Sequence, residues 1–292
     1  MKKASNQKAS TLTAESAKNI FIAEMNKKAK KIGMEHSYFV EPAGFPSTIE
    51  QVMTTRDMLK MVIHASSNKE LARIWSKKSY TMNIGGDNAR ELSIDTTVSA
   101  PMIEDEYEIF AGKTGAIWGT NEIDGFHMIL ITNAPNERKF VSAIRGASTP
   151  KTRVNDLKIA LDNAKLLLND PDATVNEIES ESVAVCLMPV PNPLSSENVE
   201  LPLIYSKNAD VPGHPASLTK IISAITALDY LTDLDEKMIL QESDITPGMG
   251  DYFHARDMIT FRDALHGMML PSSNTCATAV ARITGEKISQ KI

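Results

Sequence analysis

The chain has few cysteines and histidines, and neither type is spaced for a metal or disulfide site. Cys186 lies in an apolar segment and Cys276 in a predicted helix, so both are expected to be small buried residues rather than a disulfide framework. The six histidines include no His-x-x-x-His pair, and no Gly-x-Ser-x-Gly elbow occurs. We therefore expect no metal and no cofactor, and a Ser-His-Asp triad is disfavoured.

Long apolar runs and an excess of positive charge are also absent. No run approaches the about 20 apolar residues of a membrane-spanning helix. Residues 1–16 are polar, so they are expected to form a flexible extension or linker rather than a secretory signal. A formal net charge of −6 disfavours a nucleic-acid surface. With 42% hydrophobic residues over 292 positions, the chain can bury a large core without disulfides.

One segment places a serine one helical turn before a lysine, at the start of an apolar helix. Ser217 and Lys220 share a helix face, so the lysine amine can reach the serine hydroxyl. Pro215 suits a position just ahead of that helix. The apolar residues that follow leave almost no polar face: Ile221, Ile222, Ala224, Ile225, Leu228 and Leu231. A lysine removed from water loses preference for its charged form, so Lys220 is predicted to activate Ser217 as a nucleophile.

The Ser-x-x-Lys spacing alone is weak evidence. It also begins at Ser5, Ser66 and Ser148, all in polar surroundings. A capping serine followed by a lysine that extends to the surface is the alternative interpretation of any single copy. Only the copy at Ser217 opens a helix that must be buried.

Two further motifs strengthen the prediction for Ser217. The segment FAGKTGA contains Lys113-Thr114-Gly115, a triplet found nowhere else in the chain. The segment LPSSN contains Ser272 and Asn274 at Ser-x-Asn spacing. Ser-x-x-Lys, Ser-x-Asn and Lys-Thr-Gly together are the signature of penicillin-binding proteins and class A β-lactamases.

The surrounding sequence resembles one family in particular, the D-alanyl-D-alanine carboxypeptidases, or low-molecular-mass penicillin-binding proteins. The likeness lies in IYSKNADVPGHPASLTK, FRDALHGMMLPSSNTCATAVA and MNKKAKKIGMEHSYFVEPAGF, and it runs from about Ala17 to Gly285. One loop departs from the family, which usually shows Asn-Pro-x-Gly-Leu where this chain has EPAGF from Glu41 to Phe45. The resemblance implies a β-lactamase/transpeptidase-like fold and a location outside the cytoplasmic membrane, in the cell envelope or secreted.

The order of the motifs differs from that of the family. The family has Ser-x-x-Lys first and Lys-Thr-Gly last, whereas here Lys-Thr-Gly comes first. Joining Ile292 to Met1 would restore the family order, so the chain is interpreted as circularly permuted. Permutation is tolerated when the original termini lie close together. A natural permutation, an engineered one and a cut across tandem copies all remain open.

The resemblance also implies roles for the motif residues in a serine-ester mechanism that removes the terminal D-alanine from peptidoglycan stem peptides. Ser217 would attack the carbonyl and Lys220 would take its proton. Backbone N–H groups of Ser217 and Ala116 would stabilise the oxyanion. Ser272 would relay a proton to the departing D-alanine, and Asn274 would hold the substrate amide and the Lys220 amine. The terminal carboxylate would be bound by Lys113 and Thr114, with Gly115 allowing close approach of the ligand, and penicillins would acylate the same serine.

Two other functions remain open. A serine β-lactamase is one, because Ala116 directly after Lys-Thr-Gly is more familiar from β-lactamases, although no Glu-x-x-Leu-Asn or Tyr-x-Asn segment occurs. A non-catalytic penicillin-binding sensor domain is the other, and it would need a membrane-spanning segment. Glutaminases and esterases built on the same serine–lysine pair are a further class.

Apolar periodicity and turn residues predict the elements. Helices are expected over residues 17–32, 54–65, 69–75, 154–168, 261–269 and 275–283, and strands over 107–116, 125–132, 139–146, 183–190 and 201–206. Residues 79–104 receive no assignment.

These elements predict an α/β (α+β) fold with five mainly antiparallel strands in a three-layer sandwich. The helix at 154–168 is expected on one face of the sheet and the serine helix on the other. Residues 17–292 form one catalytic domain, with a helical lobe at about 17–105 and 233–292 and a sheet lobe at about 106–232. The acidic segment 170–180 would be the linker that joins the family's original termini. The site is expected between the lobes.

Overall fold

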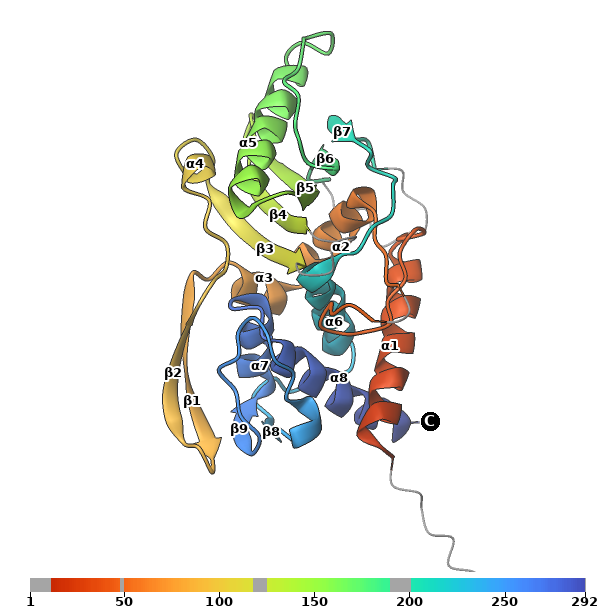
Figure 1. The fold of residues 1–292 in the computed structure, drawn as a ribbon, viewed down its shortest axis with the longest axis vertical. Coiled ribbons are helices and arrows are strands. Elements are labelled where there is room, and N and C mark those ends of the chain that lie inside the picture. The colour runs from red at the N-terminus through yellow and green to blue at the C-terminus, as the bar shows by residue number, and fades with distance from the viewer. Residues whose placement is uncertain (1–11, 48–49, 118–124, 190–200, 292) are drawn as a thin grey trace, which may run out of the picture.

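The computed structural model describes residues 12–47, 50–117, 125–189 and 201–291. The central element is an antiparallel sheet in the order β3-β4-β5-β6-β7 (Figure 1). Its strands are β3 (Ile109–Ile117), β4 (Gly125–Asn133), β5 (Lys139–Ala147), β6 (Ser182–Leu187) and β7 (Tyr205–Lys207). The predicted α/β fold with a five-stranded antiparallel sheet is confirmed.

Helices cover both faces of this sheet. α5 (Pro150–Leu167) packs on one face, and α2 (Thr55–Ser67) packs on β5 and β6 from the other. The prediction that the serine helix supplies this second layer was wrong. That helix, α6 (Thr219–Leu228), packs mainly against α1, α2, α7 and α8. Its nearly all-apolar surface fits a position surrounded by helices better than a position on a sheet face.

The remaining elements form a mainly helical region below the sheet in Figure 1. Its helices are α1 (Ala14–Lys31), α3 (Lys69–Trp75), α7 (Phe261–Met269) and α8 (Asn274–Ser289), with 3-10 turns η1 (Ala216–Leu218) and η2 (Glu242–Asp244). The short helix α4 (Pro101–Glu104) packs instead against α5. α1 begins at Ala14, so residues 14–16 are helical rather than part of the predicted extension.

A second sheet that the sequence analysis did not predict lies at the edge of this region. It has the order β2-β1-β9-β8, formed by β1 (Ser79–Gly86), β2 (Arg90–Asp95), β8 (Lys237–Ile239) and β9 (Asp257–Thr260). The β1–β2 hairpin lies in the segment left unassigned. It is joined to β9 by the pairing of Gly85 with Met258, a contact between residues far apart in sequence.

Local capping explains where the long helices begin. Thr13, Thr54, Thr149, Thr260 and Ser273 each accept a hydrogen bond from the backbone N–H three residues later. At α7 the cap is reciprocal, because Asp263 also accepts from the backbone N–H of Thr260. α8 therefore begins inside the Ser-x-Asn motif, which fixes that motif relative to a buried helix.

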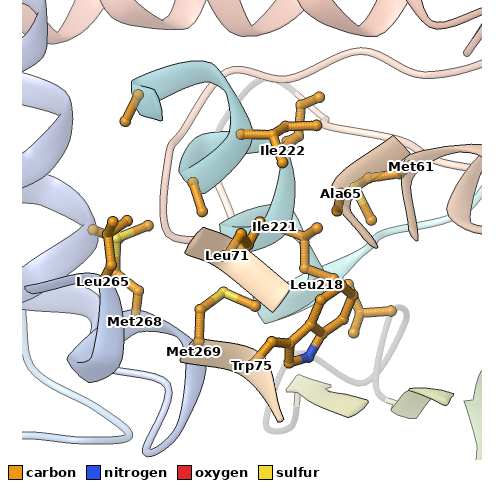
Figure 2. Packing of buried hydrophobic residues seen from close by; sticks show 14 of the residues in the cluster. Met61, Ala65, Leu71, Trp75, Leu218, Ile221, Ile222, Leu265, Met268 and Met269 are labelled. Carbon is orange, nitrogen blue, oxygen red and sulfur yellow. The ribbon is translucent and has the colours of Figure 1, made fainter. Parts of the chain in front are cut away.

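The apolar core has two parts, one between the sheet and α5 and a larger one among the helices. Figure 2 shows side chains of the larger part, with Leu218 beside Trp75 and Ile221 and Ile222 on the same helix. Leu218 and Ile221 are fully buried. Since both belong to the serine segment, this core anchors the backbone that carries Ser217.

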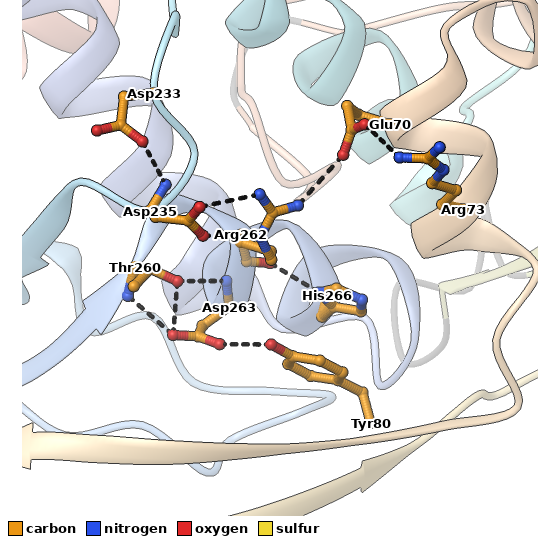
Figure 3. A network of polar contacts seen from close by, with 9 residues as sticks. All are labelled: Glu70, Arg73, Tyr80, Asp233, Asp235, Thr260, Arg262, Asp263 and His266. Atoms are coloured by element: carbon orange, nitrogen blue, oxygen red, sulfur yellow. Dashed lines mark hydrogen bonds and ion pairs between the residues drawn. The ribbon is translucent and has the colours of Figure 1, made fainter.

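A polar network ties the second sheet to α7 (Figure 3). The Tyr80 hydroxyl of β1 donates to Asp263 at 2.9 Å, and the Tyr80 ring stacks on His266 with ring centroids 3.6 Å apart. Arg262 forms ion pairs with Asp235 and Glu70. These contacts hold α7 in place, and α7 leads directly into the Ser-x-Asn segment.

Candidate active site

Ser217 lies in a tight turn that precedes α6. The residue before it, Ala216, has a left-handed φ of 49°, a conformation that costs energy for a residue with a side chain. Two hydrogen bonds hold it there: its N–H donates to His214 Nδ1 at 3.0 Å, and its carbonyl accepts from Thr219 Oγ1 at 2.8 Å. The strained turn is thus fixed from both sides and presents Ser217 on a rigid support.

Two glycines let other segments approach this turn. A Cβ at Gly44 would lie 2.0 Å from the Ala216 carbonyl oxygen, and one at Gly115 would lie 3.2 Å from the Ala216 Cβ. Gly115 brings β3 against the serine turn, and its predicted role in the close approach of a ligand stays a prediction. Gly44 brings the loop formed by residues 41–45 against the same turn.

The amine of Lys220 contacts three oxygens. Its Nζ lies 2.9 Å from Ser217 Oγ, 2.7 Å from Asn274 Oδ1 and 2.6 Å from the Ala43 carbonyl oxygen. Carbonyl and amide oxygens only accept hydrogen bonds, whereas a hydroxyl can also donate. A neutral amine has two N–H bonds and one lone pair. When the two acceptors take the N–H bonds, the lone pair faces the Ser217 hydroxyl, which is the arrangement that proton transfer requires.

The burial of Lys220 favours this neutral form. The side chain is fully buried, and desolvation lowers the pKa of Lys220 to about 7, while the negative charge of Glu41 partly opposes the shift. An amine with a pKa near neutrality can accept a proton at physiological pH. The predicted nucleophile and base are therefore in contact, and the pKa of the base suits proton transfer near neutral pH.

Lys113 and Ser272 form a second pair. Lys113 is fully buried on β3, and its Nζ donates to Ser272 Oγ at 2.8 Å and to the Thr114 carbonyl oxygen at 2.9 Å. Burial lowers the pKa of Lys113 well below its usual range, and a proton on Lys220 would lower it further. Ser272 has a left-handed φ of 69°. The structure thus connects Ser272 to Lys113, which gives this hydroxyl a direct proton donor.

Asn274 connects Lys220 to the backbone of Pro247. Its Oδ1 accepts from Lys220, and its Nδ2 donates to the Pro247 carbonyl oxygen at 3.1 Å. Among the described residues, one amide hydrogen of Nδ2 has no acceptor, because Nδ2 carries two and donates one to Pro247. The predicted contact between Asn274 and the lysine is present.

Two cavities meet at Ser217 and Ala116. One, of about 330 Å³, is lined by apolar residues including Phe45 and Met249 together with Asn274. The other, of about 270 Å³, which we call the polar cavity, is lined by apolar residues such as Phe126 and by several polar residues. These include Thr114, Ser272 and Arg153. All eight residues predicted for the site therefore lie at or beside one place: Ser217, Lys220, Ser272, Asn274, Lys113, Thr114, Gly115 and Ala116.

Sequence reasoning missed Arg153 and Thr97. Arg153 lies in the first turns of α5. Its Nε is buried and has no hydrogen-bond partner among the described residues, and burial lowers the pKa of its guanidinium only to about 10. It therefore stays charged at neutral pH beside the polar cavity. Thr97 Oγ1 lies 2.6 Å from Thr114 Oγ1 and orients that hydroxyl. Neither residue belongs to a motif, so only the tertiary structure reveals them.

In the described ranges, no helix is long and apolar enough to cross a membrane. Those same ranges contain no group of three or more His, Cys, Asp or Glu side chains placed to hold a metal ion. Both cysteines are buried, and burial raises the pKa of each thiol to about 12, so neither is a thiolate at neutral pH.

Two family models match different parts of the chain. The model described as D-alanyl-D-alanine carboxypeptidase matches residues 4–149, half of the chain, and contains the Lys-Thr-Gly strand. The model described as beta-lactamase enzyme family matches residues 195–292, which contain Ser217 and Ser272. No curated protein and no solved structure matches the chain.

Proposed function

Because the chain belongs to the D-alanyl-D-alanine carboxypeptidase family, a family of serine hydrolases, we propose that it removes the terminal D-alanine from peptidoglycan stem peptides and is acylated by penicillins at the same serine. The observation that carries the proposal is the set of three contacts of the Lys220 amine. They leave its lone pair facing Ser217.

In the proposed first step, Ser217 Oγ bonds to the carbonyl carbon of the penultimate residue while its proton moves to Lys220 Nζ. Backbone N–H groups of Ser217 and Ala116, where the two cavities meet, stabilise the oxyanion. The C–N bond then breaks. Ser272 gives its proton to the leaving amine and takes one from Lys113, to which it is hydrogen-bonded. Lys220 then releases the Ser217 proton to solvent and Lys113 regains a proton from solvent, so both amines return to their starting states before the second step.

In the second step, a water molecule attacks the acyl-serine. The ester C–O bond breaks, the shortened peptide leaves as a carboxylic acid, and Ser217 regains its proton. Proton transfers through Lys220 serve both steps, because the same amine is base in one direction and acid in the other.

The substrate carboxylate belongs in the polar cavity. Thr114 and Arg153 line it, and Lys113 lies beneath it against Ser272. An anion there would favour the protonated form of Lys113, because it supplies the opposite charge that the buried amine lacks. Penicillins carry a carboxylate at the corresponding place, so one subsite serves both ligands.

A serine β-lactamase is the second candidate, favoured by the match of residues 195–292 to the β-lactamase model. The two functions share acylation of Ser217 and differ in how fast a penicillin adduct is hydrolysed. We place either activity outside the cytoplasmic membrane, where the carboxypeptidase family typically works.

The test is a time course of intact mass with benzylpenicillin, with Ser217→Ala as the control. The expected result is a long-lived adduct on the parent chain and none on the variant. Release of D-alanine from a peptide ending in Lys-D-Ala-D-Ala should follow. Rapid penicillin hydrolysis without an adduct would instead identify a β-lactamase, and a folded chain that shows neither reaction would overturn the role of Ser217.

We also propose that the motif order reflects circular permutation of one catalytic domain spanning residues 17–292, with 170–180 as the linker. In support, α1 packs on α8 so closely that a Cβ at Gly285 would lie 1.9 Å from the Ala17 carbonyl oxygen. A chain in which Ile292 is joined to Met1 and which is opened within 170–180 is expected to fold and to be acylated by benzylpenicillin. Failure of this variant to fold would contradict the proposal.

A further inference from the structure

The loop of residues 41–45 differs from the family at Glu41, and the structure shows how the glutamate is used. One oxygen, Oε2, accepts hydrogen bonds from three consecutive backbone N–H groups: 2.8 Å from Ala43, 2.5 Å from Gly44 and 2.8 Å from Phe45. An oxygen that accepts three N–H bonds is that of an ionised carboxylate, and such charge-assisted bonds are short and strong. Glu41 therefore fixes the path of the loop.

The same loop touches the serine–lysine pair directly. The Ala43 carbonyl oxygen accepts from Lys220 Nζ at 2.6 Å, and the Pro42 carbonyl oxygen accepts from Ser223 Oγ at 2.7 Å. Gly44 lies against the Ala216 carbonyl, one residue before the nucleophile. A change in loop path would thus remove one of the two acceptors that orient the lysine lone pair.

Glu41 is also the negative charge that faces this lysine. The titratable groups facing Lys220 from the elements packed against it are Glu41 on the loop, Lys113 on β3 and Cys276 on α8. The Cys276 thiol is neutral and Lys113 carries no negative charge, so among these groups only Glu41 is an anion at neutral pH. Burial raises the pKa of Glu41 itself, but the three N–H donors and Lys220 oppose that rise.

We propose that Glu41 is a positioning residue for acyl transfer: one carboxylate both shapes the 41–45 loop around Lys220 and supplies the counter-charge that sets how readily the amine holds a proton. The inference rests on the proposed function of Ser217 and Lys220. It assigns to this chain's own loop a role that the three motifs do not contain.

The test compares two substitutions by the rate of acylation with benzylpenicillin between pH 5 and 9. Glu41→Gln keeps an oxygen acceptor but removes the charge. Without the anion the protonated form of Lys220 is less favoured, so the midpoint of the rise in rate should move to lower pH by about 1 unit. The acylation rate of Glu41→Gln on the high-pH plateau should stay within about threefold of the rate of the parent chain. Glu41→Ala also loses the acceptor, so its plateau rate should fall at least about tenfold.

The matched control is Glu35→Gln, which makes the same charge change on an exposed residue of a nearby segment. Its midpoint should equal that of the parent chain. A Glu41→Gln midpoint that does not move, or that moves equally in the control, would overturn the inference. If the parent chain is not acylated at all, the proposed function fails instead, so the two failures are distinguishable.

Discussion

Replacing Gly44 with alanine should displace the nucleophile. The added Cβ would lie 2.0 Å from the Ala216 carbonyl oxygen and 2.9 Å from the Ser217 backbone nitrogen. Carbon and oxygen atoms in contact are normally more than about 3 Å apart, so one of the two backbones must move by about 1 Å. Both partners are backbone, and no side-chain rotation can relieve the overlap.

The expected size of the effect follows from this displacement. A misplacement of about 1 Å in a reacting group costs on the order of 100-fold in rate. The left-handed conformation at Gly44, with a φ of 90°, adds about 1–2 kcal/mol of destabilisation for any residue with a side chain. Gly44→Ala should therefore lose about 100-fold in acylation rate as well as some stability.

Gly33→Ala is a matched control for the destabilisation that comes from the left-handed backbone conformation. Gly33 also has a left-handed φ, of 76°, but the atom nearest to an added Cβ is 3.8 Å away. Both variants should lose the energy of the left-handed backbone conformation, measured by urea unfolding, and Gly44→Ala should lose more because of the overlap. Only Gly44→Ala should lose acylation, measured by intact mass with benzylpenicillin. If Gly44→Ala is acylated within about threefold of the rate of Gly33→Ala, the reasoning about the serine turn is refuted.

Three further predictions test other parts of the structure. Acylation by benzylpenicillin should fall about 30-fold from pH 8.5 to 5.5, because the pKa of Lys220 is about 7 and only the neutral amine accepts the Ser217 proton; a flat stopped-flow profile would contradict this. Arg153→Ala should raise KM for a peptide ending in D-Ala-D-Ala at least about tenfold, with a smaller effect on kcat, and an unchanged KM would exclude it from carboxylate binding. Asp244→Ala removes the buried partner of Arg282 and leaves it the partly exposed Glu286, so urea unfolding should show a loss of about 3 kcal/mol; a loss below about 1 kcal/mol would show that the pair is not structurally important.

Local interactions explain which parts of the fold and site could be predicted from sequence. The contact between Ser217 and Lys220 follows from their spacing on one helix turn, and α3 and α7 have the predicted bounds because their caps and apolar periodicity are local. Their formation depends little on distant residues.

The features that sequence reasoning missed depend on distant contacts. Arg153 reaches the site because α5 begins beside the Lys-Thr-Gly strand, and no local pattern records that approach. Buried and exposed residues alternate only weakly along β1, and β1 pairs with β9, whose residues come much later in the chain. In the part of the chain that the structure describes, the hydrogen bonds of Glu41 come from backbone N–H groups, so no partner side chain marks its role in the sequence.

The packing of α1 on α8 has a consequence for how the chain folds. α1 carries the buried residues Phe21 and Met25, and it is synthesised long before α8, the helix against which it packs most extensively. Contacts between segments so distant in sequence carry a high loop-closure entropy and form late. The apolar face of α1 should therefore stay exposed on the ribosome until α8 emerges, and the helical region should complete its folding only once α8 has been synthesised. Until then it is open to aggregation or to chaperones.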